Sequence, residues 1–240
     1  LVAVVAIEAG VYGRIERIPT APVDRDAAHV AANPLSKVPT LVLEDGTALY
    51  GGPVIYEYLD SLHDGPKMFP SGGEARWTAL RQMITGDGIF DATTLIRIES
   101  WRDKATWHLD AMLRERRKIF GALHLLEEDA KAFTADVFHI GHVCIAGGLS
   151  YLNLRNPIRD ADLEPGDADW DWRAGRPALS AWWEAAIQRP SVQSHFNKDY
   201  GGEDSAEYCQ AKVADVLRAQ GKTAPDSPAP LPVDFVPPGD

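Results

Sequence analysis

The sequence predicts a small α/β domain of about 60 residues followed by an all-helical domain. Two short β-prone segments flank the turn Glu44-Asp45-Gly46, which is the pattern of a hairpin. The stretch His63–Gly73 is rich in glycine and proline and is typical of a linker, and beyond it apolar residues recur only at helical spacing. These observations divide the chain into a first domain, a linker, a helical domain and a C-terminal extension, at 1–63, 64–73, 74–200 and 201–240.

The first ten residues form an apolar stretch that predicts a buried helix closed by Gly10. Glycine suits that position because it accepts the left-handed conformation that ends many helices. A secretory signal is the alternative, but the stretch has no basic start and no small-residue cleavage site. Because a helix that opens at Leu1 looks like the middle of a domain, we expect further residues upstream.

Four more elements are predicted before the linker. They are a short strand at Ile15–Ile18, a helix at Asp24–Asn33, a hairpin of strands 40–43 and 47–50, and a helix at Val54–Leu62. Pro34 ends the first of these helices and Pro53 suits the first turn of the second. The face of the second helix that we expect to point inward carries Val54, Ile55, Tyr58, Leu59 and Leu62.

The second domain is predicted to be a helical bundle. Its helices are expected at Glu74–Trp101, Lys104–Glu128, Ile140–Leu154, from Arg176-Pro177 onward, and at Glu203–Gln220. The third should be central because it is apolar nearly all round. The core is expected to include Trp77, Leu80, Ile84, Ile89, Leu95 and Ile98 of the first helix and Leu179, Trp182, Trp183 and Ile187 of the fourth.

Charge and composition exclude several classes of function. With 24 Lys+Arg against 35 Asp+Glu the net charge is −11, which argues against nucleic-acid binding and against docking on an anionic membrane. The charged run Arg114–Lys118 predicts a solvated helix face, with a specific anion site as the alternative. Two cysteines favour a reducing, cytoplasmic setting, and no apolar run is long enough to span a membrane. The proline-rich stretch Gly221–Asp240 predicts an extended tail.

Several motifs, taken together, carry a family resemblance. In the first domain they are NPLSKVPTL at Asn33–Leu41, DGTAL from Asp45, and VIYEYL from Val54; in the second they are Ile140-Gly141-His142, Trp172–Leu179 and Arg189-Pro190. This combination resembles the cytosolic glutathione transferases of bacterial type, over about residues 1–198. The resemblance implies a thioredoxin-like first domain whose first strand is missing from the chain, a helical second domain, glutathione as co-substrate without a metal, a homodimer and a role in detoxification.

The resemblance also implies a glutathione site around Lys37, Val38 and Pro39. The family has a cis-proline at the position of Pro39, and a cis X-Pro bond costs only about 0.5–1 kcal/mol. The backbone N–H and C=O of Val38 would pair with the glutathione backbone as one more strand, and Lys37 would hold the glycine carboxylate. The alternative is an ordinary turn proline beside a solvated lysine.

Gly51 and Gly52 depart from the family, most members of which have an acidic residue and then a serine there to bind the γ-glutamyl end. The helix N-terminus still offers free N–H groups and a positive dipole end to a carboxylate. The missing hydroxyl and the missing carboxylate could each weaken binding by roughly 1–2 kcal/mol. A plain turn is the alternative role for the two glycines.

His139 and His142 stand where the family has a Ser or Thr cap and an Asp. With Cys144 nearby a metal site can be considered, but the set lacks a fourth ligand and tight spacing. We therefore predict capping or packing for both histidines.

The catalytic residue is unknown and expected upstream of Leu1, because the family keeps it in a loop before this helix. Cys144 is no substitute, since a thiol on an apolar central helix is usually inert. The pocket for a second substrate is expected along the helix after the linker, with Tyr50, Ile89, Thr93, Arg97 and Trp101 as candidates.

The leading functional prediction is an enzyme that adds the glutathione thiolate to a small apolar electrophile or exchanges it there. The alternative from another class is a non-catalytic binding or regulatory protein of the same fold, favoured by Gly51-Gly52. A thiol-disulfide oxidoreductase is a third possibility and needs an upstream cysteine. The sequence does not identify the second substrate.

Overall fold

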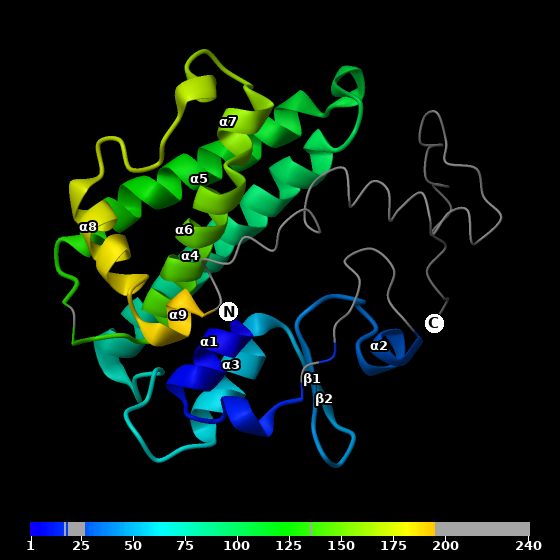
Figure 1. Cartoon of the computed structure of the whole chain (residues 1–240), viewed down its shortest axis with the longest axis vertical. Coiled ribbons are helices and arrows are strands. Elements are labelled where there is room, and N and C mark those ends of the chain that lie inside the picture. The colour runs from blue at the N-terminus through cyan, green and yellow to red at the C-terminus, as the bar shows by residue number, and fades with distance from the viewer. Residues whose placement is uncertain (17, 19–26, 135, 195–240) are drawn as a thin grey trace. The chain divides into compact units, whose positions relative to one another are not determined.

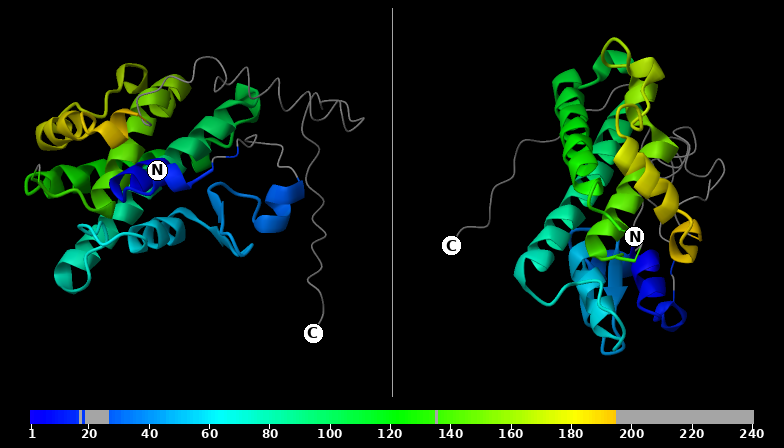
Figure 2. Two further views of the ribbon diagram at one scale, coloured as in Figure 1. Left: turned by 60° about the horizontal axis from the view of Figure 1, so that its bottom comes forward. Right: turned by 90° about the vertical axis from the view of Figure 1, so that its left-hand side faces the viewer.

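The computed structural model describes residues 1–16, 18, 27–134 and 136–194. The predicted helix at Glu203–Gln220 and the proline-rich tail lie outside the described residues. The described part has the predicted architecture, a thioredoxin-like domain with a small sheet followed by a helical domain (Figure 1). In Figure 2 the long helices of the second domain run side by side, and α4 contacts both α5 and α6.

The N-terminal helix α1 spans Val2–Glu8 and buries Val4, Val5 and Ala6. The chain leaves it through Gly10, whose φ of 70° is the left-handed conformation predicted for that glycine. The predicted strand at Ile15–Ile18 is wrong in its described residues. The 3₁₀ turn η1, Tyr12–Arg14, comes directly before it, and Ile15 donates its N–H back to Tyr12 instead of to a neighbouring strand.

The predicted hairpin is confirmed. Strands β1 (Thr40–Val42) and β2 (Ala48–Tyr50) pair antiparallel, with Thr40 opposite Tyr50. Each strand is one residue shorter than predicted. Before them lies α2, Ala27–Ala32, which ends ahead of Pro34 as predicted, while residues 24–26 lie outside the described part.

Helix α3, Gly52–Ser61, begins two residues earlier than predicted, with Pro53 in its first turn. Ile55 and Leu59 are buried as expected, but Val54 is 53% exposed and Tyr56 is buried instead. The inward face is rotated because α3 packs against α1, and the side of α3 that carries Tyr56 enters this contact. The Asp60 carboxylate then accepts the N–H groups of Met68 and Phe69, which fixes the connection toward α4.

The long helix α4 spans Gly73–Ser100, as predicted, but its core face was predicted wrongly. Of the six residues expected inside only Ile89 is fully buried, and the exposed ones are Trp77, Ile84, Leu95 and Ile98. The buried face includes the small residues Ala79, Gly86 and Ala92. A Cβ on Gly86 would lie 2.3 Å from the carbonyl carbon of Cys144, so α4 and α6 meet backbone to backbone and leave the larger side chains outside.

Helix α6, Ile140–Arg155, is the central helix, as predicted, and 12 of its 16 residues are buried. Around it lie α5 (Leu109–Ala130), α7 (Pro157–Ala161), α8 (Pro177–Ala186) and α9 (Pro190–Gln193), with short 3₁₀ turns η2 (Lys104–Thr106) and η3 (Asp167–Asp169). The predicted helix start at Lys104 is wrong, because Trp107 adopts an extended conformation between η2 and α5. In α8, Leu179 and Trp183 are buried and Trp182 is half-buried.

Two residues of the charged run on α5 are largely covered, since the side chains of Glu115 and Arg116 are 14% and 15% exposed. Arg116 forms a bidentate pair with Asp167, at 2.7 Å from Nη2 to Oδ1, and the Asp167 side chain is 2% exposed. The Arg116–Asp167 pair joins α5 to η3, and the charged run is a solvated face except at Glu115 and Arg116.

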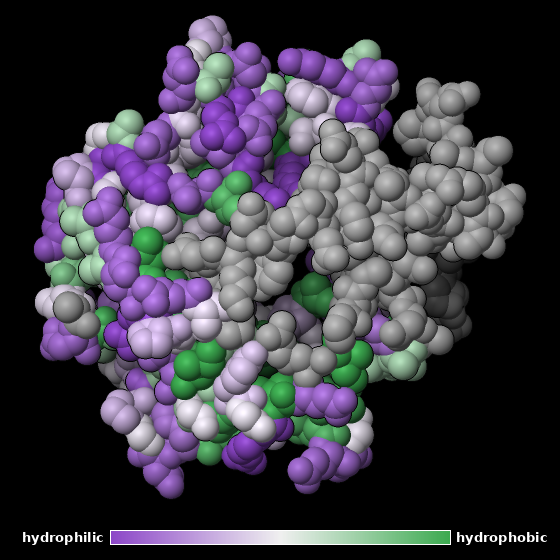
Figure 3. Space-filling view, viewed as in Figure 1, coloured by the Kyte–Doolittle hydropathy of each residue, from purple (hydrophilic) through white to green (hydrophobic). Residues whose placement is uncertain are grey.

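The surface seen in Figure 3 is mixed in polarity over the helical domain, with apolar patches over the first domain in the lower part of the view. Among the described helices, none is both long and apolar enough to cross a membrane.

Candidate functional site

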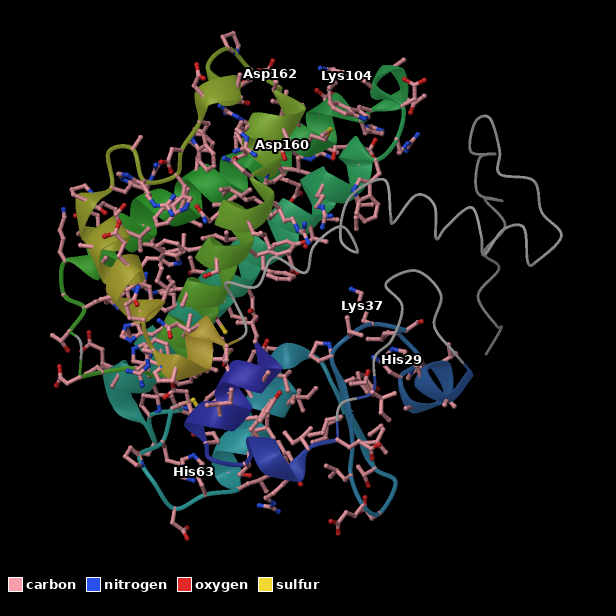
Figure 4. The ribbon with its side chains drawn as sticks, viewed as in Figure 1. His29, Lys37, His63, Lys104, Asp160 and Asp162 are labelled. Carbon is pink, nitrogen blue, oxygen red and sulfur yellow. The ribbon has the colours of Figure 1, made fainter. Side chains whose placement is uncertain are left out.

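The loop before β1 places Lys37 and Val38 at the surface. The Val38-Pro39 peptide bond is cis, as the sequence predicts. Val38 is 53% exposed, and its backbone N–H and C=O form no hydrogen bond with any other described residue. Figure 4 shows the Lys37 side chain projecting away from the ribbon, with its amine in the open. The loop therefore presents the unpaired backbone N–H and C=O of Val38, with the Lys37 amine beside them.

Asn33 holds this loop in place and was not singled out as a site residue from the sequence. Asn33 is buried, with only 1% of the residue exposed. Its Nδ2 donates to the carbonyl of Lys37 at 2.8 Å and to Oγ1 of Thr40 at 3.0 Å. Its Oδ1 accepts the N–H of Leu35 at 3.0 Å. The Asn-Pro step ahead of the loop is the signal that could have identified it, because Asn commonly bonds the backbone of a following turn.

The N-terminus of α3 lies next to the same loop. Gly51 precedes the helix with φ 87°, a conformation that favours glycine, and its N–H points to the carbonyl oxygen of Pro39 at 3.4 Å. The first N–H groups of a helix have no partner within it and carry the positive end of its dipole. The two predicted halves of the site, Lys37–Pro39 and Gly51-Gly52, are therefore adjacent in the structure.

Tyr56 reaches back to the start of α3. A Cβ on Gly52 would lie 2.5 Å from the Tyr56 hydroxyl, so the hydroxyl fills the space that a side chain at position 52 would need. Burial raises the pKa of Tyr56, and the acidic groups of Cys144, Asp87 and Asp91 nearby add to this shift. The phenol is therefore protonated at neutral pH and available as a donor.

The neighbours of Tyr56 on α4 and α6 are an acid and a thiol. Burial raises the pKa of Asp87 to about 6; the charge of Asp91 adds to this shift, and a hydrogen bond with the Cys144 thiol opposes it. Burial also raises the pKa of Cys144 well above its ordinary value. A buried, protonated thiol is a poor nucleophile, as the sequence predicts for Cys144.

The candidates for a second pocket separate into two groups. Ile89 and Thr93 are 0% exposed and lie inside the helical domain, so they cannot line a pocket that a substrate enters. That part of the prediction is corrected: in a 28-residue helix, residues four apart share a face, and this face is the one packed into the domain. Tyr50, at the end of β2, is 39% exposed.

Arg97 and Trp101 remain as half-buried neighbours on the last turns of α4. The Arg97 guanidinium lies 5.3 Å from the centre of the Trp101 ring, and its Nη1 lies 3.4 Å from the Tyr151 hydroxyl. Tyr151 of α6 stacks on Phe90 of α4, with ring centres 4.2 Å apart. The sequence did not predict that Phe90 and Tyr151 would lie beside Arg97, because their stacking depends on how α4 and α6 meet.

The two histidines cap and pack the start of α6. The Nδ1 of His139 accepts the N–H of Gly141 at 3.1 Å, and Nδ1 of His142 contacts the carbonyl of Val137 at 3.0 Å. Their rings stack at 3.9 Å. Burial lowers the pKa of both, that of His142 to about 3, with the charge of His139 adding to the shift of His142. Within the described ranges, no group of three His, Cys, Asp or Glu side chains is placed to hold a metal ion.

Comparison with known proteins gives this geometry its context. Residues 2–62 match the family model of the glutathione S-transferase N-terminal domain. The chain is 31% identical over 172 residues to the uncharacterized GST-like protein YibF of Escherichia coli K12, covering 71% of this chain and 80% of that protein. The chain belongs to the glutathione transferase family.

Solved structures of other glutathione transferases are similar to this fold. A family member from Pseudomonas fluorescens Pf-5 with bound glutathione is 36% identical, with a TM-score of 0.70 over 80% of this chain and 90% of that one. A structure from the same organism with bound S-(propanoic acid)-glutathione is 34% identical, with a TM-score of 0.68 over 82% and 92%. A glutathione transferase of Methylobacterium radiotolerans in complex with glutathione sulfonate is 28% identical, with a TM-score of 0.70 over 85% and 92%.

Proposed function

We propose that this glutathione transferase binds glutathione and joins its sulfur to a small apolar electrophile. The observation that carries the proposal is the exposed, unpaired backbone of Val38 beside the N-terminus of α3. An extended peptide can add to such a backbone as a further strand. Related proteins crystallised with glutathione and with two of its derivatives support the same ligand class.

In the proposed complex each end of glutathione meets a different element. Lys37 attracts the glycine carboxylate, Val38 pairs with the central backbone, and the α3 N-terminus at Gly51-Gly52 receives the γ-glutamyl end. The thiolate then forms a carbon–sulfur bond to the electrophile. In a substitution the leaving group departs with the electron pair of its bond, and in an addition the neighbouring carbon takes up a proton. We assign no residue of this chain to lowering the thiol pKa.

The second substrate is proposed to lie against the end of α4, near Arg97 and Trp101, with Tyr50 on the side of the sheet. These side chains offer aromatic surface and one cation. They suit a substrate that is mainly apolar.

Titration of the protein with glutathione by calorimetry tests the proposal. We expect binding in the micromolar to millimolar range, and its loss in Val38→Pro, which has no N–H to donate. Val38→Ala is the matched control, because it retains the backbone groups and should bind like the wild type. The absence of binding at millimolar glutathione, or undiminished binding by Val38→Pro, would overturn the proposal.

A non-catalytic binding protein is the second candidate, favoured by the absence of any side-chain donor at Gly51 and Gly52 themselves. A thiol-conjugation assay with a generic aromatic electrophile separates the two. Turnover that depends on glutathione supports the enzyme, whereas tight binding without turnover supports the alternative.

We further propose a cytoplasmic homodimer with a role in detoxification. The support for the dimer is the exposed apolar stripe of α4, where Trp77 is 70% exposed and Ile84 is 58% exposed. Sedimentation should give twice the monomer mass, and Trp77→Glu should shift the protein to the monomer. A monomeric wild type at micromolar concentration would contradict this part.

A further inference from the structure

The start of α3 carries a second feature besides its free N–H groups, namely the Tyr56 hydroxyl. Tyr56 is 3% exposed, and its hydroxyl forms no hydrogen bond with any described residue. The residue as a whole is buried, but its hydroxyl oxygen is not sealed from solvent, so the hydroxyl is a donor that a ligand can reach. The group that would satisfy it must come to the N-terminus of α3.

The direction of the Tyr56 side chain follows from helix geometry. Side chains on a helix lean toward its N-terminus, so residue 56 covers residue 52, one turn earlier. This position is open only because Gly52 has no side chain, since a Cβ there would lie 2.5 Å from the hydroxyl oxygen and 2.7 Å from the ring carbon that bears it. Gly52 and Tyr56 thus form a matched pair, a small residue that makes room and a long one that delivers a hydroxyl.

The hydrogen-bond donors at the N-terminus of α3 favour an anionic ligand. The free N–H groups of the first turn, the positive end of the helix dipole and a protonated phenol all favour a bound carboxylate. The negative groups near Tyr56, Asp87 and Asp91 on α4, suit an ammonium group on the same ligand. An α-amino acid end, with its carboxylate and ammonium on one carbon, has both.

We propose that the Tyr56 hydroxyl donates a hydrogen bond to the α-carboxylate of the γ-glutamyl group of glutathione, supplying from the second turn of α3 the hydroxyl that Gly52 lacks. The inference rests on the proposed function, since it names a residue that selects the same ligand. It accounts for Gly52 as space for Tyr56, where the sequence alone suggests a weakened site.

The test compares glutathione binding to the wild type and to Tyr56→Phe. Removing one hydrogen bond to a charged group should weaken binding about tenfold. In the conjugation assay KM for glutathione should rise by a similar factor while kcat changes little, because the lost contact is far from the sulfur. Tyr58→Phe, on the same helix but partly exposed, is the control and should bind like the wild type.

Two variants with serine at position 52 test whether the Tyr56 hydroxyl takes the place of a serine hydroxyl at the helix start. Gly52→Ser alone should bind weakly, because the new side chain competes with the Tyr56 hydroxyl for the same space. Gly52→Ser combined with Tyr56→Ala should regain most of the wild-type affinity, since the serine can then donate from the helix start. Circular dichroism melting of each variant separates loss of binding from loss of folding.

A glutathione analogue whose γ-glutamyl α-carboxylate is converted to the amide identifies the group that Tyr56 contacts. The analogue should bind the wild type and Tyr56→Phe about equally. If the wild type binds glutathione and Tyr56→Phe binds it equally well, the inference is wrong and the proposed function stands. If the wild type itself does not bind glutathione, the proposed function fails.

Discussion

The N-termini of α3 and α6 differ in how their first backbone groups are satisfied. At α6 the His139 side chain accepts the N–H of Gly141, and stacked rings cover the end. At α3 the preceding residue is Gly51, no side chain caps the helix, and the nearest hydroxyl, that of Tyr56, has no partner among the described residues. The first end is closed by the protein itself, whereas the second leaves donors for a ligand.

The difference shows that unusual residues at a helix start have no single meaning. Both ends depart from the residues that the family resemblance implies, two histidines at one and two glycines at the other. At the start of α6, His139 caps the helix in place of the family's Ser or Thr, and the His142 ring stacks on it. This helix end therefore has a structural role. Gly51 and Gly52 leave the start of α3 without a side-chain cap, and Gly52 also makes room for Tyr56. Exposure makes that end a candidate for binding.

Among the single substitutions considered, the largest expected effect is at the start of α6, the closed end. In Gly141→Ala the new Cβ would lie 2.7 Å from Cβ of Gln82 and 2.8 Å from the carbonyl oxygen of Ala79. Because backbone of α4 must move, we expect the free energy of unfolding to fall by about 2–3 kcal/mol, measured by urea denaturation. Gly121→Ala on α5, with open space at its Cβ, is the control and should be neutral or slightly stabilising. Equal stabilities for the two variants would contradict the close packing.

Acid should weaken the closed end next. His142 has a pKa of about 3 in the folded protein, against about 6.5 in an unfolded chain, and burial lowers that of His139 as well. Between these values the unfolded chain binds more protons, so stability is fully present above pH 6.5 and declines as the pH falls toward 3. Each histidine contributes a slope of up to about 1.4 kcal/mol per pH unit.

Denaturation of the wild type and of His142→Phe across pH 4–8 measures this slope. The variant should show a smaller decline toward acid even if it is less stable overall. Identical slopes would show that His142 is not held neutral by burial.

At the start of α3, the open end, a substitution of Gly51 should lower the stability through backbone conformation and not through packing. Gly51 has φ 87° and nothing within 4 Å of an added Cβ, so Gly51→Ala should lose about 1–2 kcal/mol through conformation alone. Gly13→Ala is the matched control in the same domain, with open space and an ordinary φ. Thermal unfolding should separate the two variants, and coincident melting curves would contradict a conformational role for Gly51.

The smallest expected effect is loss of the histidine cap. His139→Ala removes the acceptor for the Gly141 N–H and should cost about 1 kcal/mol. His139→Asn should retain most of the stability, because asparagine is a good capping residue. If both variants lose the same amount, ring stacking with His142 matters more than the cap.

Local patterns predicted much of the fold and part of the site. The hairpin, the cis peptide at Pro39 and the limits of α4 and α6 are confirmed, because turn residues, proline and apolar period act within a few residues of one another. The apolar residues of α4 that the sequence predicts in the core, Trp77, Ile84, Leu95 and Ile98, are exposed in the structure. Hydropathy along one helix cannot show that small residues will bring a second backbone into contact.

The sequence by itself determined the domain order, the family and the candidate loop at Lys37–Pro39. The tertiary structure decided which face of α4 is buried, that Arg116 pairs inside the protein, and that Tyr56 reaches Gly52 beside Pro39. The reason is the range of the interactions involved. Backbone conformation depends on neighbouring residues, whereas the partner of a buried polar group depends on segments far apart in the chain.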